Sequence, residues 1–167
     1  KLPDYMIQIS LPDTGNEEWE ATRECFETGW LTSGPKVRGF EEAFAKRHGA
    51  EFGVAATSCT TALHLALAAL DIGPGDEVIV PAFTWVATAN VVLYCGAEVV
   101  FVDIDRFTFN IDPAQVGAKV TGRTKAIIAV HLFGLCADMD ALREAAPGIP
   151  IIEDAACAVG ATYGGVS

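Results

Sequence analysis

Two adjacent carboxylates, Glu153 and Asp154, follow a short apolar run at 149–152 that contains a proline. Such a run, bounded by Pro and by polar residues, is typical of a strand buried on both faces of a parallel sheet. Ligands of open α/β sheets bind at the carboxyl ends of these strands. Because an unpaired buried charge is costly, Asp154 needs a partner. It either caps the next element or pairs with an Arg, or it holds a cationic group on a cofactor.

Hydroxyl side chains gather where an earlier apolar segment meets a helical one, in the run T-S-C-T-T at 57–61. The free N–H groups at a helix start bind anions such as phosphate, and Ser58, Thr60 and Thr61 can add donors. Considered alone, these residues also fit ordinary Ser/Thr capping. The patterns G-x-x-x-x-G-K-[ST] and G-x-G-x-x-G are absent from this part of the sequence, which disfavours a P-loop and a Rossmann dinucleotide site.

Trp85 stands at the start of a third candidate segment, after Phe83-Thr84. A Trp beside a strand end can stack on an aromatic ligand, although a core Trp is at least as common. Phosphate donors, a stacking ring and a carboxylate at neighbouring strand ends together suit a flat, phosphorylated, cationic heteroaromatic ring. Pyridoxal 5'-phosphate (PLP) matches this description, since a carboxylate that keeps its ring nitrogen protonated makes the ring an electron sink.

The segments that must position these groups alternate between apolar strands and amphipathic helices. We expect strands at 52–56, 77–81, 97–102, 125–130 and 150–152, and helices at 16–28, 37–48, 62–70, 85–94, 113–118 and 138–147. Asn16 and Thr84 are the expected caps of two of these helices. The alternation predicts right-handed βαβ units. The fold class is therefore α/β, a three-layer, mostly parallel sheet with helices on both faces.

Composition argues against nucleic-acid binding and against a membrane-spanning or secreted protein. The formal net charge of −11 argues against a nucleic-acid partner, which needs a basic face. The apolar stretches are interrupted too often to span a bilayer, and residues 1–5 lack the apolar core of a signal peptide.

The cysteines and histidines also set expectations. An odd number of cysteines without paired spacing indicates free thiols, and hence a cytoplasmic protein: Cys25, Cys59, Cys95, Cys136 and Cys157. The three histidines are too scattered for a metal site: His48, His64 and His131. We expect His131 to be a satisfied core histidine.

Several runs, in order along nearly the whole chain, resemble the sugar aminotransferases of the DegT/StrS type, which are fold type I, aspartate-aminotransferase-like PLP enzymes. They are Trp30–Val37, Phe40–Glu42, Ser58–Leu67, Gly73–Thr84, Val100–Asp105, His131–Asp140 and Glu153–Ala156. The resemblance implies that Thr60 and Thr61 bind the PLP phosphate, with Cys59 in the same turn. It also implies that Trp85 stacks on the ring and that Asp154 holds the pyridinium nitrogen.

The sequence departs from the family pattern at two cofactor positions. Position 157, which commonly carries Gln near the ring hydroxyl, is Cys157, and a thiol is a weaker donor than an amide. Position 59 is usually Gly and here is Cys59, so the phosphate turn must tolerate a side chain. The family's Schiff-base lysine lies beyond Ser167. We therefore expect residues 1–167 to be the N-terminal part of the PLP-binding large domain, without the small domain and without a catalytic residue of their own.

The resemblance implies a PLP-dependent aminotransferase that acts on a nucleotide-linked keto-sugar, with glutamate or glutamine as amino donor. It also implies a homodimer with active sites shared across the interface. Two alternatives stay open. One is a PLP-dependent sugar dehydratase of the same family, in which a His replaces the lysine. The other is a non-catalytic regulatory or binding protein on the same scaffold.

Overall fold

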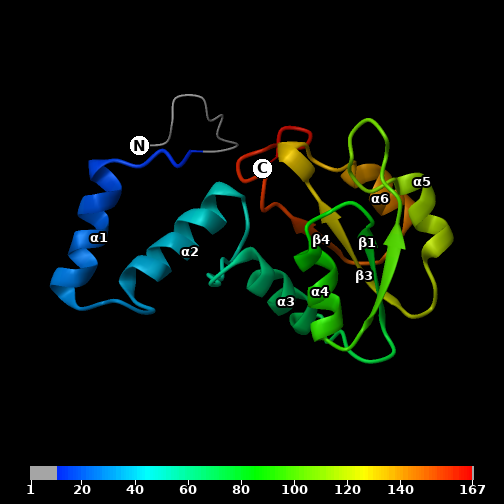
Figure 1. The fold of residues 1–167 in the computed structure, drawn as a ribbon, viewed down its shortest axis with the longest axis horizontal. Coiled ribbons are helices and arrows are strands. Elements are labelled where there is room, and N and C mark those ends of the chain that lie inside the picture. Colours follow the sequence, from blue (N-terminus) through cyan, green and yellow to red (C-terminus); the bar gives the residue numbers. More distant parts are fainter. Residues whose placement is uncertain (1–10, 167) are drawn as a thin grey trace, which may run out of the picture.

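The computed structural model describes residues 11–166, and the expectation about residues 1–5 lies outside them (Figure 1). The helices are α1 (Asn16–Thr28), α2 (Pro35–Arg47), α3 (Cys59–Ala69), α4 (Val86–Tyr94), α5 (Pro113–Val116) and α6 (Met139–Ala145). The strands are β1 (Glu77–Pro81), β2 (Glu98–Val102), β3 (Thr124–Val130) and β4 (Ile151–Asp154). Two short 3-10 turns, η1 (Gly117–Lys119) and η2 (Leu132–Gly134), follow α5 and β3.

The four strands form one parallel sheet in the order β2-β1-β3-β4. Each crossover between consecutive strands carries a helix, as the alternation of the sequence predicts. Because all strands are parallel, their carboxyl ends meet at one edge of the sheet, where Pro81, Val130 and Asp154 end their strands. This is the edge at which α/β proteins bind ligands.

Helices cover both faces of the sheet, so alternate strand residues enter two separate cores (Figure 1). Val78 and Val80 pack with residues of α3 and α4, whereas Ile79 between them packs with residues of α5 and α6. All three are fully buried. This two-sided burial explains why β1 and β3 read as continuous apolar runs, and it confirms the predicted three-layer α/β class.

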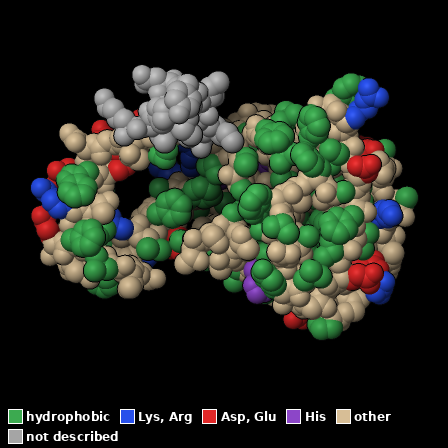
Figure 2. Space-filling view, viewed as in Figure 1, with side chains coloured by type: hydrophobic (Ala, Val, Ile, Leu, Met, Phe, Trp, Pro, Cys, Tyr) green, Lys and Arg blue, Asp and Glu red, His purple; other side chains and the backbone are tan. Residues whose placement is uncertain are grey.

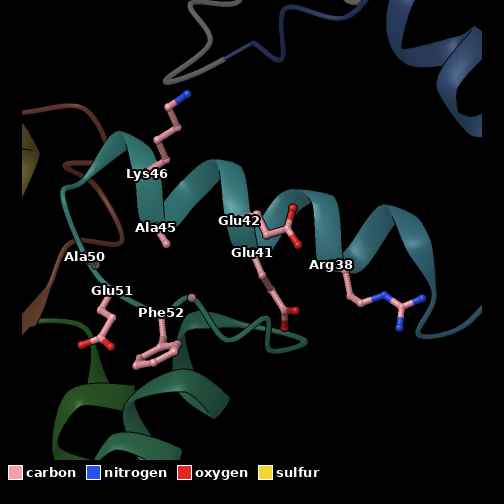
Figure 3. Close-up of a pocket in the computed structure, with 9 residues that line it drawn as sticks. Arg38, Glu41, Glu42, Ala45, Lys46, Ala50, Glu51 and Phe52 are labelled. Atoms are coloured by element: carbon pink, nitrogen blue, oxygen red, sulfur yellow. The ribbon is translucent and has the colours of Figure 1, made fainter.

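Helices α1 and α2 extend away from the sheet, at the blue and cyan end of the chain in Figure 1. No residue of α1 is buried, and Trp19 and Phe26 are among its exposed large apolar side chains. Figure 2 shows hydrophobic side chains on the surface at this end of the molecule. Helix α2 is attached to the following segment through Glu41, whose Oε1 accepts a 2.8 Å hydrogen bond from the Ala55 N–H. Figure 3 shows Glu41 reaching from α2 toward this segment, across a pocket that Phe52 also lines.

Close backbone packing accompanies this attachment. A Cβ added at Gly53 would lie 2.5 Å from the Glu41 carbonyl oxygen, so only glycine fits there. The segment 52–56 forms neither helix nor strand and pairs with no strand among the described residues, so the prediction of a strand there is wrong. Its apolar pattern is real, since Phe52 and Val54 alternate, but both side chains are exposed.

Three local expectations need correction. The N-cap of α1 is Gly15, one residue before Asn16, and its N–H donates to Glu18 Oε2 at 2.7 Å. The N-cap of α4 is Trp85 without a side-chain cap, because the Thr84 hydroxyl bonds within the next turn instead. Strand β4 extends through Asp154, two residues beyond the predicted end, because its register with β3 continues to Val130.

Candidate cofactor site

Asp154 ends β4 as a buried carboxylate with 6% of its surface exposed. Its Oδ1 accepts from the Cys59 thiol at 3.4 Å and from the Ala156 N–H at 3.2 Å. Its Oδ2 accepts from the Thr88 hydroxyl at 3.1 Å. No Lys, Arg or His of residues 11–166 forms an ion pair with it, which removes the interpretation of Asp154 as the partner of an Arg within that range.

These contacts join three elements at one point. Cys59 is the first residue of α3, Thr88 lies in the first turn of α4, and Asp154 closes β4. The three donors to Asp154 are the Cys59 thiol, the Thr88 hydroxyl and the Ala156 N–H, and all of them are electrically neutral. These hydrogen bonds solvate the negative charge of Asp154 but do not neutralise it. Because a buried charge is costly without an opposite charge, the arrangement suits a cationic ligand beside the carboxylate.

Trp85 lies one helical turn before Thr88, a donor to this carboxylate. Its carbonyl oxygen accepts a 3.1 Å hydrogen bond from the N–H of Thr88, whose hydroxyl contacts Asp154. The Trp85 side chain is 77% exposed, so the alternative of a core Trp is wrong. An exposed indole at the start of the helix that contacts this buried anion is available to stack on a flat cation. Stacking itself stays a prediction.

The turn before α3 combines capping with free donors. Ser58 is the N-cap, and its Oγ accepts from the Thr61 N–H at 3.2 Å. The Thr61 hydroxyl is bonded to Ser58 Oγ at 2.9 Å and to Thr57 Oγ1 at 3.1 Å. The first two N–H groups of the helix, those of Cys59 and Thr60, have no intrahelical acceptor and remain for an anion. Capping and anion binding are therefore compatible here, with Thr61 serving mainly the cap.

Both departures from the family pattern lie near Asp154. Burial, followed by the negative charge of Asp154, raises the pKa of the Cys59 thiol to about 11. This thiol is therefore neutral near pH 7 and acts as a hydrogen-bond donor. Cys157 is exposed in the turn after β4, and its carbonyl lies 3.6 Å from the position of a Cβ added at Gly134.

Sequence reasoning missed Thr88, although it is fully buried and touches Asp154. The sequence feature that could have indicated Thr88 is its i, i+4 spacing from Thr84, which brings two hydroxyls together at the start of the helix. Their oxygens lie 2.9 Å apart. Without the location of Asp154 in space, that spacing alone does not distinguish a site from ordinary Ser/Thr back-bonding.

The neighbouring carboxylate, Glu153, serves another contact. Its Oε2 lies 2.7 Å from Nε2 of buried His131, whose Nδ1 accepts from the Ala137 N–H at 3.1 Å. Both ring nitrogens are thus bonded, which confirms the prediction of a satisfied core histidine. Side chains alternate along a strand, so Glu153 and Asp154 belong to opposite faces of β4.

Two further classes of site are absent from residues 11–166. No group of three or more His, Cys, Asp or Glu side chains there is arranged to hold a metal ion. None of the described helices has both the length and the apolar character needed to cross a bilayer.

Comparison with known proteins identifies relatives of this chain in sequence and in fold. The chain is 50% identical over 162 residues to the GDP-perosamine synthase of Caulobacter vibrioides, covering 95% of this chain and 44% of that protein. It superposes on an aminotransferase from Psychrobacter cryohalolentis with a TM-score of 0.88 and 40% identity, over 93% of this chain and 40% of the other. It superposes on a GDP-4-keto-6-deoxymannose-3-dehydratase with a TM-score of 0.90 and 33% identity, over 96% and 44%.

The chain thus spans less than half the length of the curated relatives that it matches, between 42% and 44%. The match to the family itself is nearly complete along this chain, from residue 12 to residue 167. With this match and the shared fold, the chain belongs to the DegT/DnrJ/EryC1/StrS aminotransferase family.

Proposed function

We propose that the intact protein is a PLP-dependent aminotransferase that acts on a nucleotide-linked keto-sugar, with glutamate or glutamine as amino donor. The observation that carries this proposal is the buried Asp154 carboxylate, which accepts hydrogen bonds from neutral donors alone among residues 11–166. One of these donors, Thr88, lies one helical turn after the exposed Trp85. A protonated pyridine ring would supply the positively charged partner that no residue of 11–166 provides for this carboxylate.

Different residues of the site are proposed to bind different groups of PLP. Asp154 would accept the ring N–H and stabilise the protonated ring, while Trp85 would stack on one ring face. The N–H groups of Cys59 and Thr60 at the start of α3, together with hydroxyls of that turn including Thr61, hold the phosphate. Cys157, exposed after β4, is the residue that would lie near the ring hydroxyl. When bound, PLP supplies an electron sink for proton removal at the carbon next to the transferred nitrogen.

Two similar proteins support the substrate class by the reactions that they are named for. One is a GDP-perosamine synthase, and the other is a dehydratase of GDP-4-keto-6-deoxymannose, a nucleotide-linked keto-sugar. The dehydratase crystal also holds a trapped PLP-glutamate geminal diamine. We extend both features, the sugar substrate and the amino-acid donor, to the intact form of this protein.

The assembly and location follow from the family proposal. We propose that residues 1–167 form the N-terminal part of the PLP-binding large domain, and that the rest of this domain and a small domain follow, because the matched relatives are more than twice as long. The Schiff-base lysine belongs to that following part. We further propose a homodimer with shared active sites, in the cytoplasm, where the free thiols of Cys59 and Cys157 stay reduced.

A dehydratase is the second candidate, because the dehydratase structure superposes on this chain with a TM-score of 0.90. The two activities differ in the residue that meets the PLP aldehyde, a lysine in the aminotransferase and a histidine in the dehydratase. The part of the site that residues 11–166 form is common to both, so the discrimination depends on the intact protein.

The test uses the full-length protein purified with PLP. An aminotransferase should absorb in the near-visible range, and borohydride should abolish this absorbance and fix the cofactor mass to a lysine. PLP bound without borohydride fixation indicates the dehydratase, and no binding at all indicates the non-catalytic alternative. In each bound case Asp154→Asn should weaken PLP binding strongly. The control Asp140→Asn, at an exposed carboxylate, should not change it.

A further inference from the structure

The Asp154 carboxylate has a limited number of positions left for a cofactor. A carboxylate offers about four acceptor positions, two on each oxygen. Cys59 and Ala156 occupy both positions on Oδ1, and Thr88 occupies one on Oδ2. The remaining acceptor position is therefore on Oδ2, the oxygen that Thr88 orients.

The direction of the Thr88 hydrogen bond is fixed by its partner. An ionised carboxylate only accepts, so the Thr88 hydroxyl must donate its single proton to Oδ2. The Thr88 oxygen then accepts from the Thr84 hydroxyl, 2.9 Å away. The result is a directed chain of donors from Thr84 through Thr88 to Asp154, in which each bond polarises the next.

Burial makes the hydrogen bonds from Thr84 through Thr88 to Asp154 important for orienting this carboxylate. Thr88 is fully buried and Asp154 is 6% exposed, so water does not replace a lost hydroxyl contact. Thr84 and the N-cap Trp85 directly precede α4, and Thr88 lies in its first turn, so the same helix start that presents the exposed indole also directs Oδ2. The ring-stacking group and the anchor of the carboxylate are thereby held in one rigid unit.

We propose that Thr88, supported by Thr84, is a positioning residue that directs the free acceptor position of Asp154 Oδ2 toward the ring nitrogen of PLP. This inference rests on the proposed cofactor site and deepens it. Thr88 acts through Asp154, because its side chain is fully buried and its single hydroxyl proton is donated to Oδ2. Its contribution passes entirely through the bond between Asp154 and the ring nitrogen.

The experiment measures equilibrium binding of two probes to the full-length protein. The first is PLP, and the second is deaza-PLP, in which a C–H replaces the ring nitrogen and gives Asp154 no N–H to accept. Thr88→Val keeps the shape and removes the donor, and Thr88→Ser keeps the hydroxyl. We expect Thr88→Val to weaken PLP binding about tenfold and deaza-PLP binding less than about twofold. We expect Thr88→Ser to bind both probes like the natural protein.

Thr84→Val provides a second route if Thr88→Val does not fold. It leaves the bond from Thr88 to Asp154 in place but removes the donor that supports it, so we expect a smaller loss, about threefold, again confined to PLP. Equal weakening of both probes in the variants, or no weakening of either, overturns the inference. Failure of the natural protein to bind PLP instead overturns the proposed function, so the two outcomes are distinguishable.

Discussion

Cys59 Sγ and Asp154 Oδ1 lie 3.4 Å apart, although 95 positions separate the two residues in the sequence. The contact joins the first residue of α3 to the last residue of β4. The first residue of α3 is therefore a hydrogen-bond donor to the buried carboxylate that ends β4. This position is consequently more than a tolerated side chain in a turn.

The first prediction concerns the reactivity of Cys59. Its pKa is raised to about 11, so the thiolate, which is the reactive form, is scarce at pH 8. In the absence of cofactor we expect iodoacetamide to alkylate Cys59 at least about tenfold more slowly than exposed Cys157 at this pH. Site-resolved mass spectrometry of a time course gives both rates, with Cys157 as the internal control.

The raised pKa of Cys59 also predicts how fold stability and the alkylation rate of this thiol change with pH. The pKa of Cys59 in the folded protein lies above the ordinary thiol value of 9.0, so the thiol stabilises the fold fully below pH 9 and loses this contribution as the pH rises through about 11. The alkylation rate of Cys59 should therefore still rise above pH 9. A rate that levels off below pH 9 contradicts the assigned environment. Asp154→Asn removes the negative charge and should speed the reaction.

The second prediction separates binding from stability at Trp85. Its side chain is 77% exposed, so Trp85→Ala should change the free energy of unfolding of the apo protein by less than about 0.5 kcal/mol. Loss of ring stacking should weaken PLP binding about three- to tenfold, which corresponds to about 0.5–1.5 kcal/mol. Isothermal titration gives the affinity and urea unfolding gives the stability.

Trp19→Ala is the matched control for this substitution. Trp19 is also exposed, at 64%, but it belongs to α1, away from the sheet. It should leave PLP affinity unchanged. If the two Trp variants behave alike in both measurements, Trp85 has no role in the site.

The third prediction concerns the opposite end of the sheet. Glu77 begins β1 and is buried, yet it forms an ion pair with Arg123 and accepts a 2.5 Å hydrogen bond from Thr121. Arg123 also reaches exposed Glu98 at 3.0 Å. Arg123→Met should cost about 2 kcal/mol of stability, because it leaves a buried carboxylate without its counter-ion. Glu98→Gln breaks only an exposed pair and should cost less than about 1 kcal/mol.

Urea unfolding in low and high salt checks this contrast. The loss caused by Arg123→Met should persist in high salt, since burial protects the Glu77 charge from screening, whereas that of Glu98→Gln should shrink. Comparable losses in the two variants would mean that Glu77 is not the dominant partner of Arg123.

The sheet and its helices were predictable because their signal is local. The run E-V-I-V-P at 77–81 is apolar at each central position, and both of its faces are buried, so pattern and structure agree on β1. Asp138 opens α6 as expected, since its Oδ1 caps the Ala141 N–H at 3.0 Å. In such segments the residue types alone determine the element.

Other features depended on partners far away in the sequence. The segment 52–56 has an apolar pattern, but a strand exists only where another strand pairs with it, and none of the described residues does so. The role of Thr88 likewise depends on the location of Asp154, 66 positions later. The sequence pointed to Asp154, Trp85 and the turn at 57–61 as candidate site residues. It did not indicate the hydrogen bonds by which Cys59 and Thr88 contact Asp154.

Backbone strain marks one further place at the carboxyl edge of the sheet. Phe133 has φ 55° although it is not glycine, and its side chain is 76% exposed. The turn is held by buried Asn110, whose Oδ1 accepts from the Leu132 N–H at 3.0 Å and whose Nδ2 donates to the Leu135 carbonyl at 2.9 Å. These two bonds on either side of Phe133 maintain a conformation that costs an L-residue about 1–2 kcal/mol.

The last prediction compares alanine and glycine at this position. Both remove the exposed ring, but only glycine adopts a positive φ without steric cost, so Phe133→Gly should be more stable than Phe133→Ala by about 1 kcal/mol. In a helix the order reverses, and Ala21→Gly in α1 should destabilise that helix by about 1 kcal/mol. Urea unfolding measures the Phe133 pair, and amide exchange within α1 measures the control. If alanine proves as stable as glycine at position 133, the turn stores no strain, and Asn110 holds a conformation that the backbone adopts freely.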